Sequence, residues 1–236
     1  GKTNLKVVEN KLQRQEKKLS DVGKRLLQDK DLIQAVKSQD PTRVYVKMNK
    51  YIKREDIDLL TFTTPSGQVI RRGNNSRNFK DKLPFPKVFN QLTENKKAVT
   101  TYVEYPAKIL AKEDTPSRQL SQRLKTTKKG KPGLMMLRVV PIEFLNKVQA
   151  TFVIGQLINN NSQIYNQEIK NLVFGTEKKA KNYISGIKFK EDYIIANDQF
   201  WSSKNGLKIA ADKLTSDYLT FNAPIKSSTG EKLATL

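Results

Sequence analysis

The chain has 236 residues, enough for one large domain or two small ones. Hydrophobic residues make up 37% of it and charged residues 28%, and 44 Lys and Arg against 23 Asp and Glu give a net charge of +21. Cysteine and histidine are both absent, which excludes disulfides, thiolate catalysis, Cys/His zinc sites and every mechanism that needs an imidazole. No acid/base motif, phosphate-binding loop, metal-ligand spacing or cofactor motif stands out either, so the sequence predicts no enzyme.

Residues 4–37 predict one long helix, which Asp40-Pro41 ends. Its apolar positions recur at steps of seven and therefore share one stripe of the helix: Leu5, Leu12, Leu19, Leu26 and Ile33. Two interpretations stay open. The stripe packs along a partner helix and transmits motion, as in a homodimer formed through this helix, or it lies on its own domain.

A shorter helix over 41–55 and a hairpin follow. Residues 58–64 are rich in β-branched and aromatic side chains and predict a strand. Pro65-Ser66-Gly67 provides the turn, and residues 68–72 predict the returning strand.

Residues 84–98 predict a helix and residues 98–106 a strand, after which comes the densest basic stretch, 108–131. That stretch holds many Ser, Thr and Gln residues and no aromatic side chain. Its composition is typical of a solvated, poorly ordered loop, whereas proteins that grip single strands interleave aromatic and basic residues. Contact with nucleic acid or an anionic lipid stays open as the alternative.

Residues 133–142 are apolar on both faces and predict a central strand, paired with 150–158, before a helix over 163–173. Residues 41–175 therefore predict an antiparallel sheet with flanking helices, which is an α+β arrangement. The remainder repeats the theme on a smaller scale, with strands expected at 183–189, 192–197, 218–225 and 231–236. Because the last strand runs to the final residue, we expect the sequence to be part of a larger protein, cut near a membrane span.

Two segments resemble bacterial Cache sensor domains. Residues 60–74, LTFTTPSGQVIRRGN, are similar to the strand, glycine turn and V-I-x-R hairpin of these domains. Residues 137–142, LRVVPI, followed by 150–158, resemble the pair of strands that closes the same module, and Pro224-Ile225 repeats the Pro-Ile pattern. With the long helix in front, nearly the whole chain resembles the double Cache arrangement.

The resemblance implies a PAS-like fold and a location outside the cytoplasmic membrane. It implies a long N-terminal helix (1–40), a larger membrane-distal module (41–175) and a smaller membrane-proximal module (176–236). Such domains sit between two transmembrane helices of histidine kinases, chemoreceptors or cyclases. A small ligand, most often bound in the membrane-distal module, moves the terminal helices. On this resemblance the chain is the periplasmic part of a membrane-anchored sensor and has no cofactor.

A PAS-like pocket would lie between the sheet and the layer over it. Arg72 matches the arginine of the Cache motif and is our first choice to hold a carboxylate or other anion, and Arg138 is the second. For both, an internal salt bridge or hydrogen-bond anchor, with Glu104 or Asp81 as partner, is the alternative. Tyr102 and Tyr105 fall on opposite faces of a strand, so at most one lines the pocket. The other candidates are apolar or small polar residues of the strands: Phe62, Thr64, Met135 and Leu137.

The leading hypothesis is a ligand-sensing domain. The alternative is a basic module that binds nucleic acid or another polyanion, whose affinity would fall steeply with salt because counterions are released. A scaffold with an empty pocket is a third hypothesis.

Overall fold

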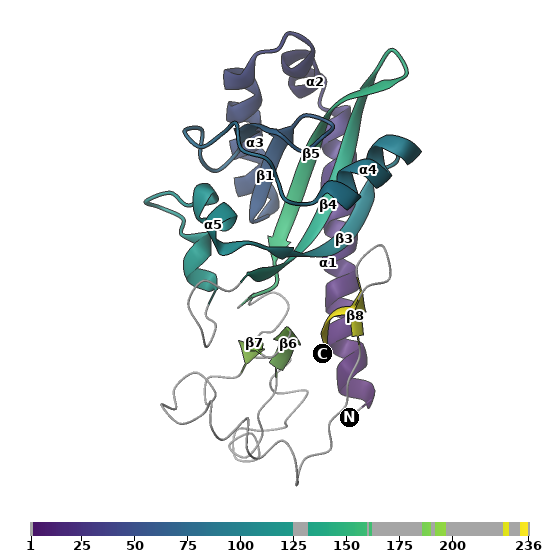
Figure 1. Ribbon diagram of the computed structural model, residues 1–236, viewed down its shortest axis with the longest axis vertical. Coiled ribbons are helices and arrows are strands. Elements are labelled where there is room, and N and C mark those ends of the chain that lie inside the picture. The colour runs from purple at the N-terminus through teal and green to yellow at the C-terminus, as the bar shows by residue number, and fades with distance from the viewer. Residues whose placement is uncertain are drawn as a thin grey trace.

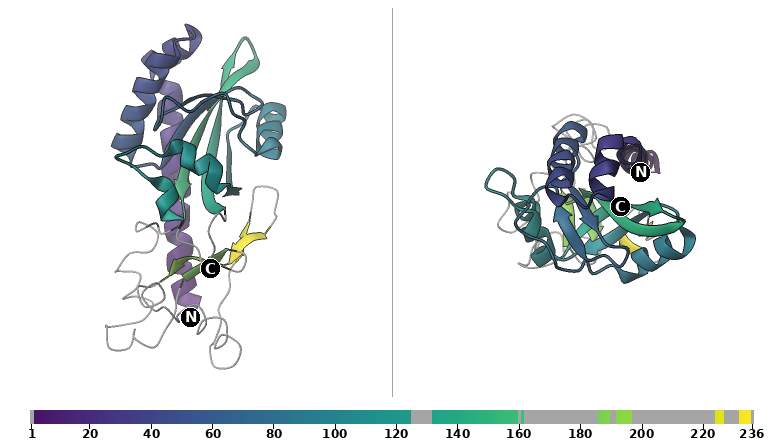
Figure 2. Two further views of the ribbon diagram at one scale, coloured as in Figure 1. Left: turned by 60° about the vertical axis from the view of Figure 1, so that its left-hand side comes forward. Right: turned by 90° about the horizontal axis from the view of Figure 1, so that it is seen from above.

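The computed structural model describes residues 2–124, 132–159, 161, 186–189, 192–196, 224–226 and 232–235. Its main body is a five-stranded antiparallel sheet with helices on both sides, which confirms the α+β prediction (Figure 1). The view from above in Figure 2 separates the two sides. We call the side under α1, α2 and α3 the helix face, and the side under α4 and residues 107–124 the loop face.

The strands of the sheet lie in the order β2-β1-β5-β4-β3, and neighbouring strands are antiparallel. Their bounds are β1 Leu59–Thr63, β2 Val69–Arg72, β3 Val99–Tyr105, β4 Gly133–Phe144 and β5 Lys147–Leu157. The strand predicted to be central, β4, does lie between β5 and β3. Leu145 and Asn146 join β4 to β5 in a tight turn, both with the left-handed φ (53° and 59°) that a two-residue hairpin of this kind requires.

The prediction of one helix over 4–37 was wrong at Asp29. The structure has two helices, α1 Lys2–Gln28 and α2 Lys30–Lys37, because Asp29 takes an extended conformation and its side chain accepts a hydrogen bond from the Leu32 amide. Asp is a favourable N-cap residue, so it starts a new helix without a proline or glycine before it. The chain then turns back into α3, Pro41–Glu55, which is capped by Asp40.

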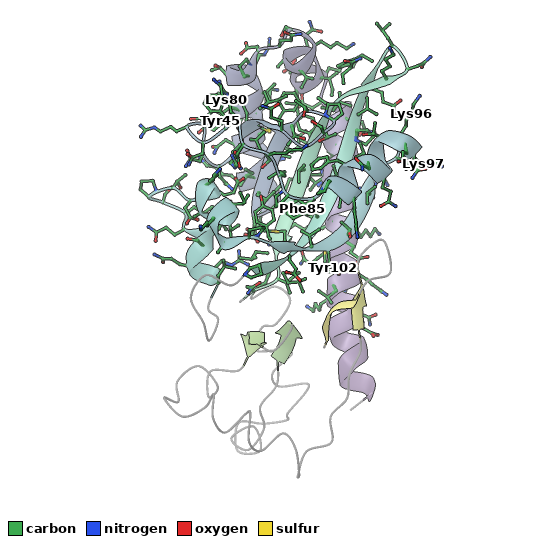
Figure 3. The ribbon with its side chains drawn as sticks, in the orientation of Figure 1. Tyr45, Lys80, Phe85, Lys96, Lys97 and Tyr102 are labelled. Carbon is green, nitrogen blue, oxygen red and sulfur yellow. The ribbon has the colours of Figure 1, made fainter. Side chains whose placement is uncertain are left out.

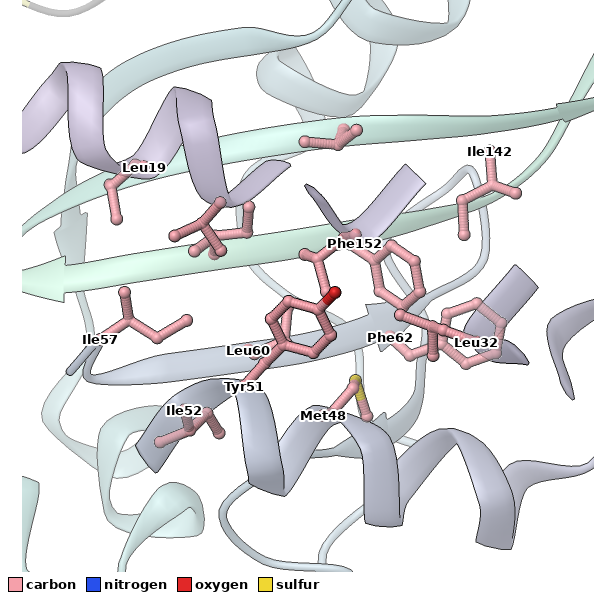
Figure 4. Close-up of a cluster of buried hydrophobic side chains, with 14 of the residues drawn as sticks. Leu19, Leu32, Met48, Tyr51, Ile52, Ile57, Leu60, Phe62, Ile142 and Phe152 are labelled. Carbon is pink, nitrogen blue, oxygen red and sulfur yellow. The ribbon is translucent and has the colours of Figure 1, made fainter. Parts of the chain in front are cut away.

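The apolar stripe of α1 packs on the helix face of its own sheet (Figure 4). Leu12, Leu19, Val22 and Leu26 are buried against the same core as residues of β4 and β5. At Gly23 the helix comes so close that an added Cβ would lie 2.9 Å from Val140 Cγ2. The described part of the stripe therefore follows the second interpretation: the helix lies on its own domain.

On the loop face, α4 (Pro86–Asn95) and the segment 107–124 cover a second core. The expectation of a poorly ordered basic loop was wrong for residues 108–124. They form α5 (Ala107–Leu110) and the 3-10 turns η1 (Ala111–Glu113) and η2 (Leu120–Arg123). Leu110 and Leu120 are buried and fix this segment to the sheet, which offsets its polar composition. Residues 125–131 lie outside the described part.

Four short strands come from the C-terminal quarter: β6 Gly186–Phe189, β7 Asp192–Ala196, β8 Pro224–Lys226 and β9 Lys232–Thr235. They form an antiparallel sheet in the order β7-β6-β9-β8, at positions that overlap the four predicted strands. The predicted helix over 163–173 lies outside the described residues, as does most of 176–236. The second PAS-like module therefore stays a prediction.

Candidate functional site

The loop face holds a buried cluster of charged side chains around Arg72, at the end of β2. The Arg72 side chain is completely buried. Its Nη1 and Nη2 donate to the two carboxylate oxygens of Asp81 at 2.8 and 2.9 Å, and Nη1 also donates to the Asn78 carbonyl at 2.7 Å. The Nε donates to Glu113 at 2.7 Å. A guanidinium commonly donates two parallel hydrogen bonds to one carboxylate, and here the acceptors around Arg72 are groups of the protein itself.

Glu113 reaches this cluster from η1, in the covering segment 107–124. Its side chain is fully buried, and its Oε1 also accepts a hydrogen bond from Thr61 Oγ1 of β1 at 3.2 Å. Asn74 Nδ2 lies 3.5 Å from Oε2. Burial raises the pKa of Glu113 to about 7, although Arg72, Thr61 and Asn74 all favour the ionised form.

Asp81 completes the charge balance. Lys112 Nζ lies 3.0 Å from its Oδ2, so two cations face two carboxylates. Hydrogen bonds from Arg72 and Lys112 outweigh burial and hold the pKa of Asp81 down at about 2. Asp81 therefore stays ionised at neutral pH, while Glu113 titrates there.

Tyr105 belongs to the same face and has an unused hydrogen-bonding group. The side chain is fully buried, its ring packs on Phe85 with centroids 5.4 Å apart, and its hydroxyl has no hydrogen-bond partner among the described residues. Burial and the negative charge of Glu113 raise the pKa of Tyr105 well above its ordinary value. A buried hydroxyl without a partner costs free energy and is uncommon in folded proteins.

A second charged cluster fastens the segment 107–124 to the sheet. Asp58 is buried, and its Oδ2 accepts hydrogen bonds from Gln156 Nε2 and the Leu157 amide at 2.8 and 2.7 Å. Its Oδ1 faces Arg118 at 3.2 Å and Arg123 at 2.5 Å. Both arginines come from the segment, so the basic stretch neutralises an acid of its own domain.

The predicted ligand residues do not all share one site. Arg72, Tyr105, Met135 and Leu137 lie on the loop face, whereas Phe62 and Tyr102 belong to the core of the helix face. The two tyrosines are thus on opposite faces, as predicted. Figure 3 labels Tyr102 on β3 and Phe85 before α4. Tyr102 donates from its hydroxyl to Glu16 of α1 at 2.9 Å, and Thr64 lies in the β1–β2 turn, where its hydroxyl accepts from the Gln68 amide.

Arg138 lies on the helix face of β4, below α1. Its Cγ is 3.8 Å from the position that a Cβ on Gly23 would take, and its Nη1 donates to Thr100 Oγ1 at 2.8 Å. Burial lowers the pKa of Arg138. The structure therefore shows this arginine as a hydrogen-bond anchor. Arg72 is shown as an internal ion pair with Asp81, one of the two partners expected for that alternative. Binding of a ligand by either arginine stays a prediction.

Glu113 was not among the residues predicted for the site. A signal was present, since Glu113 and Asp114 are the only acids between Tyr105 and Ile142 in an otherwise basic stretch. Among the described residues no group of His, Cys, Asp or Glu could hold a metal ion, and no helix there is long and apolar enough to cross a membrane. A surface pocket does exist between α4 and β3, lined by Gln91, Asn95, Lys97, Ala98, Val99 and Thr100.

The fold of this chain is similar to that of a periplasmic domain of known structure. The periplasmic domain of Vibrio cholerae LuxQ is similar over 99% of this chain and 94% of that one, with a TM-score of 0.56 and 11% sequence identity. The sensor domain of the V. cholerae histidine kinase DctB is similar over 69% of this chain and 55% of that one, with a TM-score of 0.44 and 13% identity. No family model and no curated protein matches the sequence.

Proposed function

We propose that this chain is the periplasmic ligand-sensing domain of a membrane-anchored signal-transduction protein of the histidine kinase, chemoreceptor or cyclase type. The observation that carries the proposal is the buried Arg72 cluster, which lies between the sheet and its covering layer in a fold shared with a periplasmic domain. In this proposal residues 41–175 are the membrane-distal, ligand-binding module and residues 176–236 the membrane-proximal one.

The proposed ligand is a small molecule with an anionic group, bound on the loop face. Arg72, Tyr105 and Met135 all belong to that face, which offers a cation, a buried hydroxyl and an apolar wall. Small-molecule sites combine a mostly apolar lining with a few such polar groups. Since protein groups take up the hydrogen bonds of Arg72, a ligand reaches it only by displacing one of them.

The signal would leave through α1. This helix packs on the sheet from the opposite face and lies close to Val140 of β4 and Ile154 of β5 at Gly23, so a shift of either strand is passed to it directly. A ligand moves such an element only by binding its two positions with different affinity. Homodimerisation through α1, which we also propose, would use its exposed side, where Leu27 is 43% exposed.

A thermal-shift screen of amino acids, carboxylates and amines on the whole chain tests the proposal. A compound at 100 times its Kd is expected to raise the Tm by roughly 5–10 °C. Arg72→Gln should abolish this rise, whereas Arg71→Gln should keep it, because Arg71 stacks on Phe79 at the surface instead. If no compound raises the Tm of the wild-type chain, the proposed ligand-sensing function is wrong.

The same assay, repeated at several salt concentrations, distinguishes the ligand-sensing hypothesis from the polyanion hypothesis. Binding of a carboxylate to the buried Arg72 should change little between about 50 and 200 mM salt. Binding of a polyanion to the surface lysines should weaken by orders of magnitude over that range. A steep salt dependence together with no effect of small compounds would favour the polyanion module.

A further inference from the structure

We propose that Glu113 occupies the carboxylate-binding site of this domain as an internal substitute for the ligand, and that a ligand carboxylate takes its place when residues 107–124 move away from the sheet. This inference rests on the proposed function and specifies how the site is regulated. It names the ligand group as a carboxylate and the competitor as a residue of the same chain.

Glu113 lies in a different part of the chain from the other groups that contact Arg72. All the fixed groups of the cluster come from the sheet and the chain that follows β2: Thr61 on β1, Arg72 on β2, and Asn74 and Asp81 after it. Two charged groups come from the covering segment: Glu113, which contacts Arg72, and Lys112, which contacts Asp81. The Glu113 carboxylate accepts hydrogen bonds from the Arg72 Nε and the Thr61 hydroxyl, two donors that a free carboxylate would also use. Exchange of one carboxylate for another leaves Arg72 with two carboxylate partners, while Lys112 leaves Asp81 together with the segment.

The Tyr105 hydroxyl also points to a ligand at this site. It is buried, it lies within electrostatic range of Glu113, Arg72 and Asp81, and it has no hydrogen-bond partner among the described residues. Glu113 therefore leaves one donor of the site unused. A buried polar group without a partner in a native protein calls for an explanation, and a ligand with an additional acceptor supplies one.

The segment 107–124 is held to the sheet in a way that allows it to move. The described backbone hydrogen bonds of residues 107–124 are local, such as those from the Leu110 amide to the Pro106 carbonyl and from the Asp114 amide to the Ala111 carbonyl. Its ties to the rest of the domain are made by side chains, including Asn75 Nδ2 to the Asp114 carbonyl at 2.9 Å and the two arginines on Asp58. Such a segment separates from a sheet without breaking the strand ladder, so it belongs to the parts of a fold that open locally.

Chemical rescue tests the inference. In Glu113→Ala the Arg72 guanidinium loses one of its two internal carboxylates and keeps that of Asp81, and free acetate is expected to bind in the vacated position. At ten times its Kd, acetate should raise the Tm of this variant by about 3–6 °C and saturate, compared with sodium chloride at equal ionic strength. Acetamide, which has nearly the same shape and no charge, should give no rise. Glu94→Ala, which removes an exposed carboxylate from α4, is the matched control and should not respond to acetate.

Three results would overturn the inference: no effect of acetate on Glu113→Ala, an equal effect of acetamide, or an undiminished effect in the double variant Arg72→Gln/Glu113→Ala. If Glu113→Ala does not fold, Glu113→Gln keeps the side-chain volume and removes the charge. Acetate should then bind Glu113→Gln at least about tenfold more tightly than the wild-type chain, and equal binding would contradict the inference.

The outcome is separate from that of the ligand screen. Acetate rescue of Glu113→Ala without any hit on the wild-type chain would establish the carboxylate site and refute ligand sensing by the native domain. A hit on the wild-type chain without acetate rescue would keep the proposed function and place the ligand elsewhere.

Discussion

The two faces of the central sheet solve the problem of burial in different ways. The helix face is covered by three helices, and their side chains form a continuous apolar core with those of the strands, which includes Leu19 of α1, Phe62 of β1 and Phe152 of β5 (Figure 4). The loop face is covered by one regular helix and by short turns, and beside its apolar core it buries Arg72 and Glu113. Buried ion pairs add little to stability, because the loss of hydration offsets their attraction. This contrast supports the proposal that the ligand binds on the loop face.

The largest expected effect is that of Arg72→Met, which leaves two carboxylates of the loop face without their buried partner. Removal of one member of a buried ion pair costs about 3–5 kcal/mol. The free energy of unfolding from urea titration should fall by that amount, and Arg71→Met on the same strand should cost less than about 1 kcal/mol. A loss as small as that of the control would mean that Arg72 is not buried as described.

Leu19→Ala tests the helix face. Leu19 is fully buried between α1 and the sheet, so the truncation removes apolar contact and leaves a cavity. We expect a loss of about 2–5 kcal/mol. Leu145→Ala is the control, because that side chain is 94% exposed in the β4–β5 turn. The same denaturation assay measures both, and similar values for the two variants would contradict the assignment of the core.

The pH dependence of stability distinguishes the two faces again. The folded chain holds the Glu113 proton more tightly than the unfolded chain, because burial raises its pKa to about 7. Arg72 acts against this shift, and Tyr105 lies within electrostatic range of Glu113. The stabilising contribution is therefore complete below the ordinary pKa of a glutamate and is lost as the pH rises through 7. Asp81, with its pKa at about 2, changes stability only in more acidic solution.

Between pH 5 and pH 8 the free energy of unfolding should accordingly fall by something on the order of 2 kcal/mol. Glu113→Gln should remove this dependence and Glu94→Gln should retain it. Chemical denaturation at several pH values provides the measurement. A stability that rises over this range in the wild-type chain would show that folding does not raise the pKa of Glu113.

The smallest effects come from two tyrosines on β3. Tyr102→Phe removes a hydroxyl that donates to Glu16, at an expected cost of about 1–2 kcal/mol. Tyr105→Phe removes a hydroxyl without a described partner and should change stability by less than about 0.5 kcal/mol, or raise it. Reversal of this order would remove the case for an unused donor on the loop face.

The sheet could be predicted from the sequence because its strands carry strong local patterns. Residues 58–72 show a β-rich run, a Pro-Ser-Gly turn and a return, and they form β1 and β2. Period-two alternation also placed Tyr102 and Tyr105 on opposite faces correctly. The break at Asp29 was missed because the heptad pattern continues through it, while the capping hydrogen bond that starts α2 is visible only in three dimensions.

The candidate site was only half predictable. A family resemblance drew attention to Arg72, and Asp81 was considered as its partner. Glu113 stands 41 residues away and reaches Arg72 only through the tertiary path of the segment 107–124. The basic and polar composition of this segment predicted disorder. The contacts that order it, two buried leucines and the ion pairs with Asp58, form only against the folded sheet and cannot be read from composition.

Native-state hydrogen exchange of the wild-type chain tests most directly whether one face opens and the other does not. The account predicts that amides of residues 107–124 exchange through local opening, with a free energy well below that of global unfolding, while amides of β4, β5 and the buried part of α1 exchange only on global unfolding. Protection of residues 107–124 equal to that of β4 and β5 would contradict it, because no ligand could then reach Arg72 without unfolding the domain.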